Sequence, residues 1–169
     1  MYIYITLFPL GPMPHCSNTE PIIQNLPQNQ FSASSQLDEF HPPYLSAVLT
    51  AHPIHPHIDA WVPLNNTIGQ WIQVDFAETK IVQEIELWPR PTIEGDQWVT
   101  SFKLAFSRDG VDFRFKFTPN GEQRLFQGPR NSVDIARVAI DPTEARFVRL
   151  YPQTYVRYRA VIWEMYTCV

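Results

Sequence analysis

The sequence lacks an excess of basic residues: 13 lysines and arginines stand against 17 aspartates and glutamates, giving a formal net charge of −4 over 169 residues. Non-specific binding of nucleic acid or of anionic lipid requires basic surface, so this balance argues against both, although it leaves room for a local basic patch. The sequence also lacks any run of roughly 18 apolar residues, the length that a membrane-spanning helix needs.

Cysteine is nearly absent. The two that occur, Cys16 and Cys168, lie near opposite ends of the chain. The residues alone allow either two separate thiols or one disulfide, and the disulfide would require an oxidising compartment. Residues 1–15 are apolar but lack the basic region and the small-residue cleavage site of a signal peptide. We interpret them as an N-terminal extension, with a truncated leader or a plain strand as alternatives.

Glycine is scarce (6) and proline abundant (16), and no long amphipathic helical pattern is present. Short segments of period-2 alternation occur instead, separated by turn residues. The central one follows a polar turn between Trp61 and Trp71 and buries Ile72, Val74 and Phe76 on one face. The expected strands are residues 71–76, 81–88, 98–107, 111–118, 124–126, 133–140, 145–151 and 160–166. This pattern predicts one all-β domain, a sandwich or a barrel.

The segment 111–118 (VDFRFKFT) shows the clearest alternation in the chain. Val111, Phe113, Phe115 and Phe117 would share one face of a strand. We therefore expect these phenylalanines in the core.

Six blocks in chain order point to a known family. After Cys16 and Leu26-Pro27 come FSASS (31–35), Trp61 with GQWIQVD (69–75), WVTSFKL (98–104), FSRDG (106–110), ARFVRLYP (145–152), and Glu164 four residues before Cys168. Each block alone is weak, but together and in this order they resemble the discoidin domains, also called coagulation factor five/eight C-type domains. The resemblance spans nearly the whole chain.

The resemblance implies an eight-stranded, jelly-roll-like antiparallel β-sandwich, of the galactose-binding-like kind, over residues 16–168. It further implies a Cys16–Cys168 disulfide and an extracellular binding module, secreted or part of a cell-surface protein, without catalytic activity. The ligand would be bound by loops at one end of the sandwich. By position these are the first ligand loop (residues 37–45), the second (51–58) and the third (90–97).

Ligand contacts are expected from ten residues of these loops: Phe40, His41, Tyr44, Ile54, His55, Arg90, Ile93, Glu94, Asp96 and Gln97. Phe40, Tyr44, Ile54 and Ile93 would be exposed apolar residues at the loop tips. Arg90 would hold a carboxylate or sugar hydroxyls beside Asp96 and Gln97, the alternative being a surface arginine stiffened by two prolines. Carboxylates crowd these loops and would be repelled by an anionic leaflet, which disfavours membrane binding.

Histidines are concentrated in the second ligand loop, at His52, His55 and His57, with His41 upstream. Such imidazoles could bind zinc. The intervening prolines impose extended geometry and no second ligand cluster is visible, so we expect a solvated loop without metal. A pH-sensitive ligand loop is the alternative, since imidazoles titrate near neutral pH. No cofactor is expected, and the sequence leaves calcium open.

Two charged residues lie within buried patterns, Asp75 after one apolar run and Arg149 inside another. Buried charges need partners, so we expect a structural Asp75–Arg149 pair or a shared network, with Trp61 and Trp71 in structural positions nearby. The closing strand departs from the family pattern because its arginines, Arg157 and Arg159, stand before a run of apolar residues. This departure puts an inherited ion-pair scheme in doubt.

The turn between the two tryptophans carries Asn65-Asn66-Thr67, an N-glycosylation sequon that we expect to be used if the protein is secreted. Taken together, the sequence predicts cell adhesion through recognition of a glycan or of an extracellular-matrix protein such as collagen. The alternatives are anionic phospholipid binding, an accessory carbohydrate-binding module of an extracellular enzyme, and a purely structural role.

Overall fold

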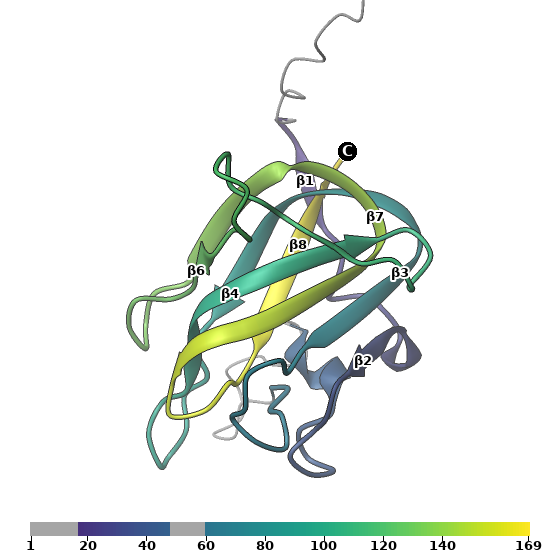
Figure 1. The fold of residues 1–169 in the computed structure, drawn as a ribbon. Helices are drawn as coiled ribbons and strands as arrows, with labels where there is room; N and C mark the ends of the chain where they lie inside the picture. The colour runs from purple at the N-terminus through teal and green to yellow at the C-terminus, as the bar shows by residue number, and fades with distance from the viewer. Residues whose placement is uncertain (1–16, 48–59) are drawn as a thin grey trace, which may run out of the picture.

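The computed structural model describes residues 17–47 and 60–169, in which nearly all regular structure is β-strand (Figure 1). The strands are β1 (Thr19–Pro21), β2 (Phe31–Ala33), β3 (Ile72–Trp88), β4 (Trp98–Ser107), β5 (Arg114–Phe115), β6 (Phe126–Gln127), β7 (Ala136–Val156) and β8 (Ile162–Cys168). Two 3-10 helices, η1 (Gln28–Gln30) and η2 (Pro43–Ser46), flank β2. The all-β class predicted from the alternating pattern is confirmed.

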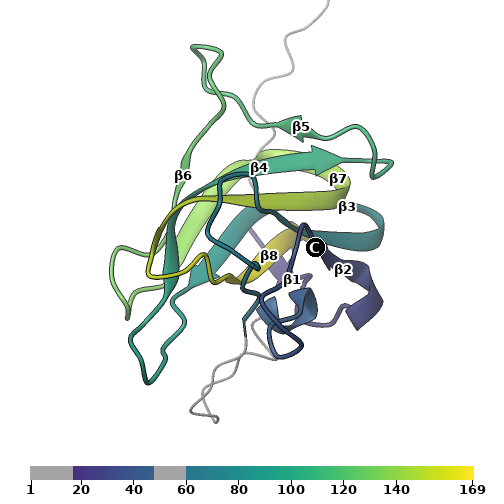
Figure 2. The same ribbon diagram turned by 60° about the horizontal axis from the view of Figure 1, so that its bottom comes forward.

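The strands pair antiparallel in the order β1-β8-β3-β7-β4-β5, with β2 added to β3 and β6 added to β4. In the first part of β3, residues 72–74 pair with β2 and residues 72–75 pair with residues 147–150 of β7. Its second part, residues 80–87, pairs with residues 136–145 of β7, and residues 82–88 pair with β8. Because β3 and β7 continue through both halves, the sheet folds over on itself as a sandwich (Figures 1 and 2).

The continuity of β3 and β7 corrects the sequence prediction, which placed two strands in each of these segments. β3 bends at Ala77, whose φ is +62°, and its pairing with β7 shifts register between Asp75 and Lys80. A bulge of this kind bends a strand without ending it. The turn-forming residues Asp141-Pro142 likewise lie inside β7. In the sequence such bends look like strand ends.

The core fills the space between the two halves of the sheet. Ile72, Val74 and Phe76 of β3 are buried as predicted, together with Phe102 of β4 and Trp163 of β8. Trp61 is also fully buried, and its indole N–H donates to the carbonyl oxygen of Ser35 at 2.8 Å. The two tryptophans differ, because Trp71 lies on the outer face and is only half-buried.

The prediction of a core strand at 111–118 is wrong. Within this segment the two residues of β5 pair with β4 and Phe117 forms a single bridge with Gln123, while Val111 and Phe117 are 81% and 57% exposed. Phe115 contacts Tyr151 on the outer face, with ring centroids 5.1 Å apart, and Phe113 lies against the guanidinium of Arg149 at 3.8 Å. Phe102 and Phe106 of β4 and Phe126 of β6 are buried in the core, whereas Phe113 and Phe115 contact the outer face of the sheet.

The first described residues are fastened to β8. The buried Glu164 carboxylate accepts hydrogen bonds from the backbone N–H groups of Ile22, Ile23, Gln24 and Met165, at 2.6–3.2 Å. Burial nevertheless raises the pKa of Glu164. Thr19 lies opposite Cys168 in the β1–β8 register. Cys16 lies outside the described residues, so the disulfide and the domain boundary at residue 16 remain predictions that this register favours.

Candidate ligand-binding groove

The first and third ligand loops lie together at the end of the sandwich opposite β1 and the C-terminus, beside the loop that leads into β3 and the turn between β7 and β8 (Figures 1 and 2). Between them runs a groove of about 410 Å3. It is lined by Leu37, His41, Val62, Arg90, Thr92, Ile93, Glu94, Gln97 and Tyr158. The second ligand loop, with Ile54 and His55, lies outside the described residues, as do His52 and His57.

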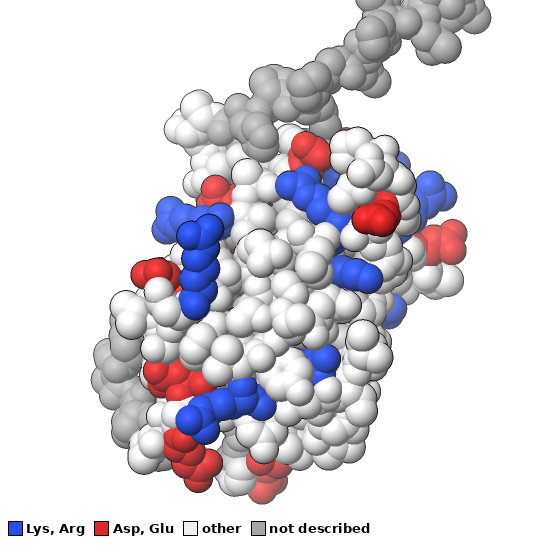
Figure 3. Space-filling model, turned by 60° about the vertical axis from the view of Figure 1, so that its left-hand side comes forward, with Lys and Arg blue, Asp and Glu red and all other residues white. Residues whose placement is uncertain are grey.

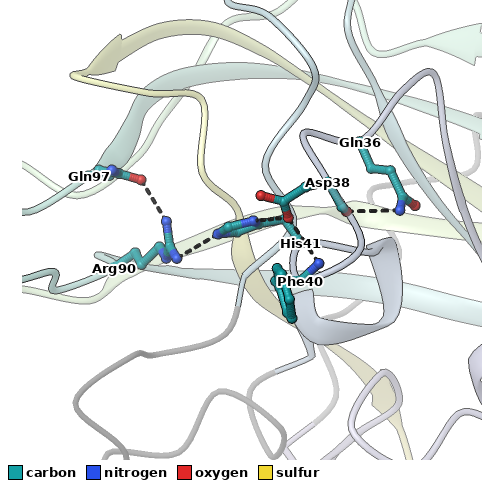
Figure 4. Close-up of polar contacts among 6 residues, drawn as sticks. All are labelled: Gln36, Asp38, Phe40, His41, Arg90 and Gln97. Atoms are coloured by element: carbon teal, nitrogen blue, oxygen red, sulfur yellow. Dashed lines mark hydrogen bonds and ion pairs between the residues drawn. The ribbon is translucent and has the colours of Figure 1, made fainter.

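A row of polar side chains joins the first and third ligand loops (Figure 4). Asp38 Oδ1 lies 2.6 Å from His41 Nδ1, His41 Nε2 lies 2.8 Å from Arg90 Nη2, and Arg90 Nη1 donates to Gln97 Oε1 at 2.9 Å. Arginine nitrogens only donate. His41 therefore accepts at Nε2 and donates from Nδ1 to Asp38, which fixes one neutral tautomer of the imidazole.

The geometry of this row is set by the backbone beneath it. Arg90 and Gln97 exchange two backbone hydrogen bonds of 2.8 Å, so they form the base of the third ligand loop. Asp38 Oδ1 also accepts the backbone N–H of Phe40 at 2.9 Å, which turns the first loop. The hydrogen bond with His41 lowers the pKa of Asp38, with the Phe40 N–H contributing. The polar row is thus held in place before any ligand arrives.

The remaining predicted loop residues do not all lie in the groove. Phe40 and Ile93 are exposed at 69% and 80%, as expected for loop tips, and Glu94 is exposed at the groove wall. Asp96 accepts the backbone N–H of Thr92 at 3.3 Å and so shapes the loop. Tyr44 corrects the prediction: it lies in η2, half-buried, and packs against the main core.

Tyr158 is a groove residue that the sequence reasoning missed. It follows Arg157, whose φ of +62° places Tyr158 in a tight turn between β7 and β8, and it is 44% exposed. The sequence pattern assigned this segment to the approach of the closing strand. A tyrosine between two arginines, directly before an apolar run, is the signal that could have indicated an exposed turn.

The third ligand loop also lies against Arg157. Gly95 has a φ of +116°, and a Cβ atom placed there would lie 2.5 to 2.7 Å from the guanidinium of Arg157. The loop end therefore carries a second arginine near Arg90. Asp38, Glu39, Glu94 and Asp96 still outnumber the two, and Figure 3 shows acidic side chains beside a basic one at the lower end of the molecule.

The predicted pairing of Asp75 with Arg149 is wrong, because each of the two residues has a different partner. Asp75 binds Arg146 through two hydrogen bonds, of 2.7 Å from Nε and 2.9 Å from Nη2, which lower the pKa of Asp75. Arg149 donates to Gln73 at 2.7 Å and lies between the rings of Trp71 and Phe113. Both arrangements lie on the outer sheet face, away from the ligand groove, so they are structural.

Within residues 17–47 and 60–169 no group of three potential metal ligands comes together. His41, the one histidine of the described ranges, is occupied by Asp38 and Arg90.

In the same ranges, none of the helices has the length and apolar character to cross a membrane. The groove is lined in part by hydrogen-bonding side chains, among them His41, Arg90 and Gln97.

The family described as the F5/8 type C domain matches residues 30–165, which include both described ligand loops, Trp61 and Glu164. The chain belongs to this family. The F5/8 type C family is a family of binding modules. The resemblance to discoidin domains that the six sequence blocks indicated is confirmed.

The relatives of this F5/8 type C domain include much longer proteins. It is 31% identical to hemocytin of Bombyx mori over 152 residues, which are 86% of the chain and 5% of hemocytin. It is 31% identical to coagulation factor VIII of Canis lupus familiaris over 140 residues, 82% of the chain and 6% of that protein. The chain thus spans about a twentieth of the length of each of these two relatives.

Solved structures share the fold. Recombinant discoidin II of Dictyostelium discoideum matches 82% of the chain and 55% of its own, with a TM-score of 0.68 and 24% identity. The family 32 carbohydrate-binding module of Clostridium perfringens NanJ, solved in complex with galactose, matches 88% and 99%, with a TM-score of 0.62 and 16% identity. The predicted antiparallel β-sandwich with loops at one end is confirmed.

Proposed function

We propose that this F5/8 type C domain is a non-enzymatic extracellular module that binds a glycan in the groove between the first and third ligand loops, and that it serves cell adhesion through this glycan. One observation carries the proposal: the row Asp38–His41–Arg90–Gln97 presents fixed donors and acceptors along a groove that Tyr158 and Leu37 also line.

This combination suits a saccharide. Small-molecule binding sites are concave and typically have volumes of about 300 to 1,000 Å3. A few polar groups in fixed positions lie among their apolar lining residues. Sugar hydroxyls both donate and accept, so they can pair with a guanidinium, an amide and a carboxylate placed side by side. Tyr158 adds an aromatic surface for the less polar face of a sugar ring. The shared fold of the galactose-bound NanJ module supports the same ligand class.

Other ligands fit less well. Carboxylates dominate the loop end, and they would be repelled by anionic phospholipid. An extracellular-matrix protein such as collagen remains the second candidate, because Arg90 could hold a carboxylate and exposed Phe40 and Ile93 could contact apolar side chains. Service as the carbohydrate-binding module of an extracellular enzyme is compatible with the glycan proposal, and would place the catalysis in another domain.

The proposal is tested by screening the purified protein on a glycan array, on immobilised collagens and on phosphatidylserine vesicles, followed by calorimetry with galactose and the best array ligand. We expect binding to a glycan, weakened at least tenfold (about 1.4 kcal/mol) by Arg90→Ala and by Tyr158→Ala. Arg108→Ala is the matched control, because Arg108 pairs with Glu144 in another pocket, away from the groove.

Each of the other possible results would replace the glycan proposal with a different specific function or site. Collagen binding that Arg90→Ala weakens would move the function to matrix protein recognition by the same groove. Binding to vesicles alone would establish the phospholipid function. Glycan binding unchanged in both groove variants would place the ligand site elsewhere on the domain.

A further inference from the structure

The loop between Val62 and β3 carries the sequon Asn65-Asn66-Thr67, the one Asn-x-Ser/Thr sequence in the chain. A sequon alone does not show that a glycan fits on the folded protein. In the structure Asn65 and Thr67 are both exposed on this loop. The site is therefore open to solvent after folding.

The two ends of the Asn65 amide are used differently. Its Oδ1 accepts the Thr67 backbone N–H at 3.1 Å and the Thr67 hydroxyl at 2.5 Å, with Gln70 Nε2 at 3.4 Å. Its Nδ2 makes no hydrogen bond to the described part of the chain. Nδ2 is the atom that carries the sugar in an N-glycan, so a glycan displaces no contact of the fold.

The neighbouring Asn66 has the opposite character, since it anchors the loop. Its side chain donates to the carbonyl oxygen of Arg157 at 3.3 Å and accepts the backbone N–H of Arg159 at 3.1 Å, while the Arg159 guanidinium donates to its carbonyl oxygen. Arg159 is only 5% exposed. These hydrogen bonds hold the loop to the fold one residue away from Asn65, so the attachment point has a fixed place on the domain.

Two large apolar side chains flank the sequon. Leu64 is 58% exposed and Ile68 is 77% exposed. Exposed apolar side chains that gather around one site can contact a partner or lie beneath another group. Asn65 lies between Leu64 and Ile68 in the sequence of this loop. Val62 and Tyr158 line the ligand groove, whereas none of residues 64–70 lines it.

We propose that Asn65 is N-glycosylated and that its glycan covers Leu64 and Ile68 while leaving the ligand groove open. The reaction joins Asn65 Nδ2 to C1 of the first sugar of a lipid-linked oligosaccharide. The bond from C1 to the pyrophosphate oxygen breaks, the lipid pyrophosphate leaves with the electron pair, and Nδ2 loses one proton. The inference requires the extracellular placement of the domain but not its glycan ligand.

To test the proposal, the protein is fused to a secretion leader and secreted from animal cells. Its mass is then measured by mass spectrometry before and after treatment with peptide N-glycosidase. We expect a mass above that of the polypeptide, removed by the enzyme, with Asn65 converted to aspartate. Thr67→Ala should abolish the modification, and Thr67→Ser should preserve it. Glu122→Thr places a second sequon at exposed Asn120 and shows that the chain reaches the transferase.

Modification at Asn120 without modification at Asn65 would overturn the proposal, and so would the absence of both. The covering role has its own readout: Thr67→Ala should bind a hydrophobic dye at least twofold more than Thr67→Ser. Equal dye binding by these two variants would show that Leu64 and Ile68 are not covered. Glycan-array binding should be the same for both, which separates this result from a failure of the ligand groove.

Discussion

At the scale of single residues, the ion pair between Asp75 and Arg146 makes stability depend on pH. Hydrogen bonds from Arg146 hold the pKa of Asp75 below its usual range. The pair therefore stabilises the fold fully above the unfolded-state pKa of about 3.9, and this stabilisation is lost as the pH falls through the lower folded-state pKa. The Asp75 and Arg146 side chains are 24% and 42% exposed, so solvent limits the contribution.

Replacing Asp75 by asparagine should lower the free energy of unfolding by up to about 1 kcal/mol at neutral pH. Urea denaturation at pH 7 and at about pH 2.5 measures the change, and the difference from the parent should shrink at the acidic value because Asp75 is then increasingly protonated. Glu78→Gln, which removes an exposed pair with Lys80, is the control and should have no measurable effect. A difference of equal size at both pH values would contradict the account.

The partner of Asp75 shows which residue-level contacts a sequence can reveal. The pattern predicted that Asp75 would pair with Arg149 or share a network with it, because both lie in buried patterns and a buried charge needs a partner. The choice between Arg146 and Arg149 depends on the cross-strand register. That register places Asp75 opposite Phe147 and Gln73 opposite Arg149. No periodicity in a single strand contains this information.

At the scale of elements, the bend in β3 stores backbone strain at Ala77. Its φ of +62° lies in the left-handed region, which costs an alanine roughly 1–2 kcal/mol relative to the right-handed form. Asp75 Oδ1 accepts the Ala77 N–H at 2.8 Å and supports the bend. The strain is therefore held by local contacts and by the pairing on either side.

Ala77→Gly should raise the free energy of unfolding by about 0.5–1 kcal/mol, since glycine adopts this conformation freely but loses more chain entropy on folding. Thermal and urea unfolding measure the gain. Ala77→Val is the opposing variant and should destabilise, because a β-branched residue fits this region poorly. A loss of stability in the glycine variant would mean that Ala77 is not strained.

The third ligand loop depends on Gly95 for its shape. Gly95→Ala adds strain at a φ of +116° and pushes a Cβ into the Arg157 guanidinium. We expect at least a fivefold loss of ligand binding by calorimetry, because Arg90 and Gln97 lie at the base of this loop. Gly121→Ala is the matched control: its φ is +82°, no atom lies within 4 Å of its Cβ position, and it lies in a different turn. It should cost comparable stability and leave binding unchanged.

Strands could be predicted from the sequence where one of their faces is buried against the core. Trp98–Ser107 was predicted as a strand and is β4, with the same bounds. Residues 111–118 failed the same test because alternation reports a face that contacts something apolar, and not which side of the sheet it contacts. Phe113 and Phe115 do contact neighbours, but on the outer face.

At the scale of the whole molecule, the domain boundary at residue 16 can be tested through the predicted Cys16–Cys168 disulfide. The chain-entropy model gives about 5 kcal/mol for closing a loop of this length. We expect no thiol to react in the unfolded, unreduced protein, and a large fall in melting temperature on reduction. Cys168→Ser should melt like the reduced parent. Two reactive thiols would exclude the bridge.

The family and its sandwich could be predicted from six ordered blocks, because those blocks encode the buried strands and the turns that the fold requires. The ligand groove could be predicted only in part. Arg90, His41 and Gln97 were expected from their loops, whereas Tyr158 comes from a turn far along the chain. Its place depends on the left-handed Arg157 and on how β7 returns to β8, which no local pattern describes.

The pairing of β1 with β8 also has a mechanical meaning. Residues 17 and 169 leave the fold side by side, at the end away from the ligand groove (Figure 1). Tension between them would open the antiparallel β1–β8 pair from its end, one hydrogen bond after another, which is the weakest direction in which to load a sheet. A Cys16–Cys168 bridge would carry that tension through covalent bonds. The groove would then hold its shape, and its ligand, while the module is under load.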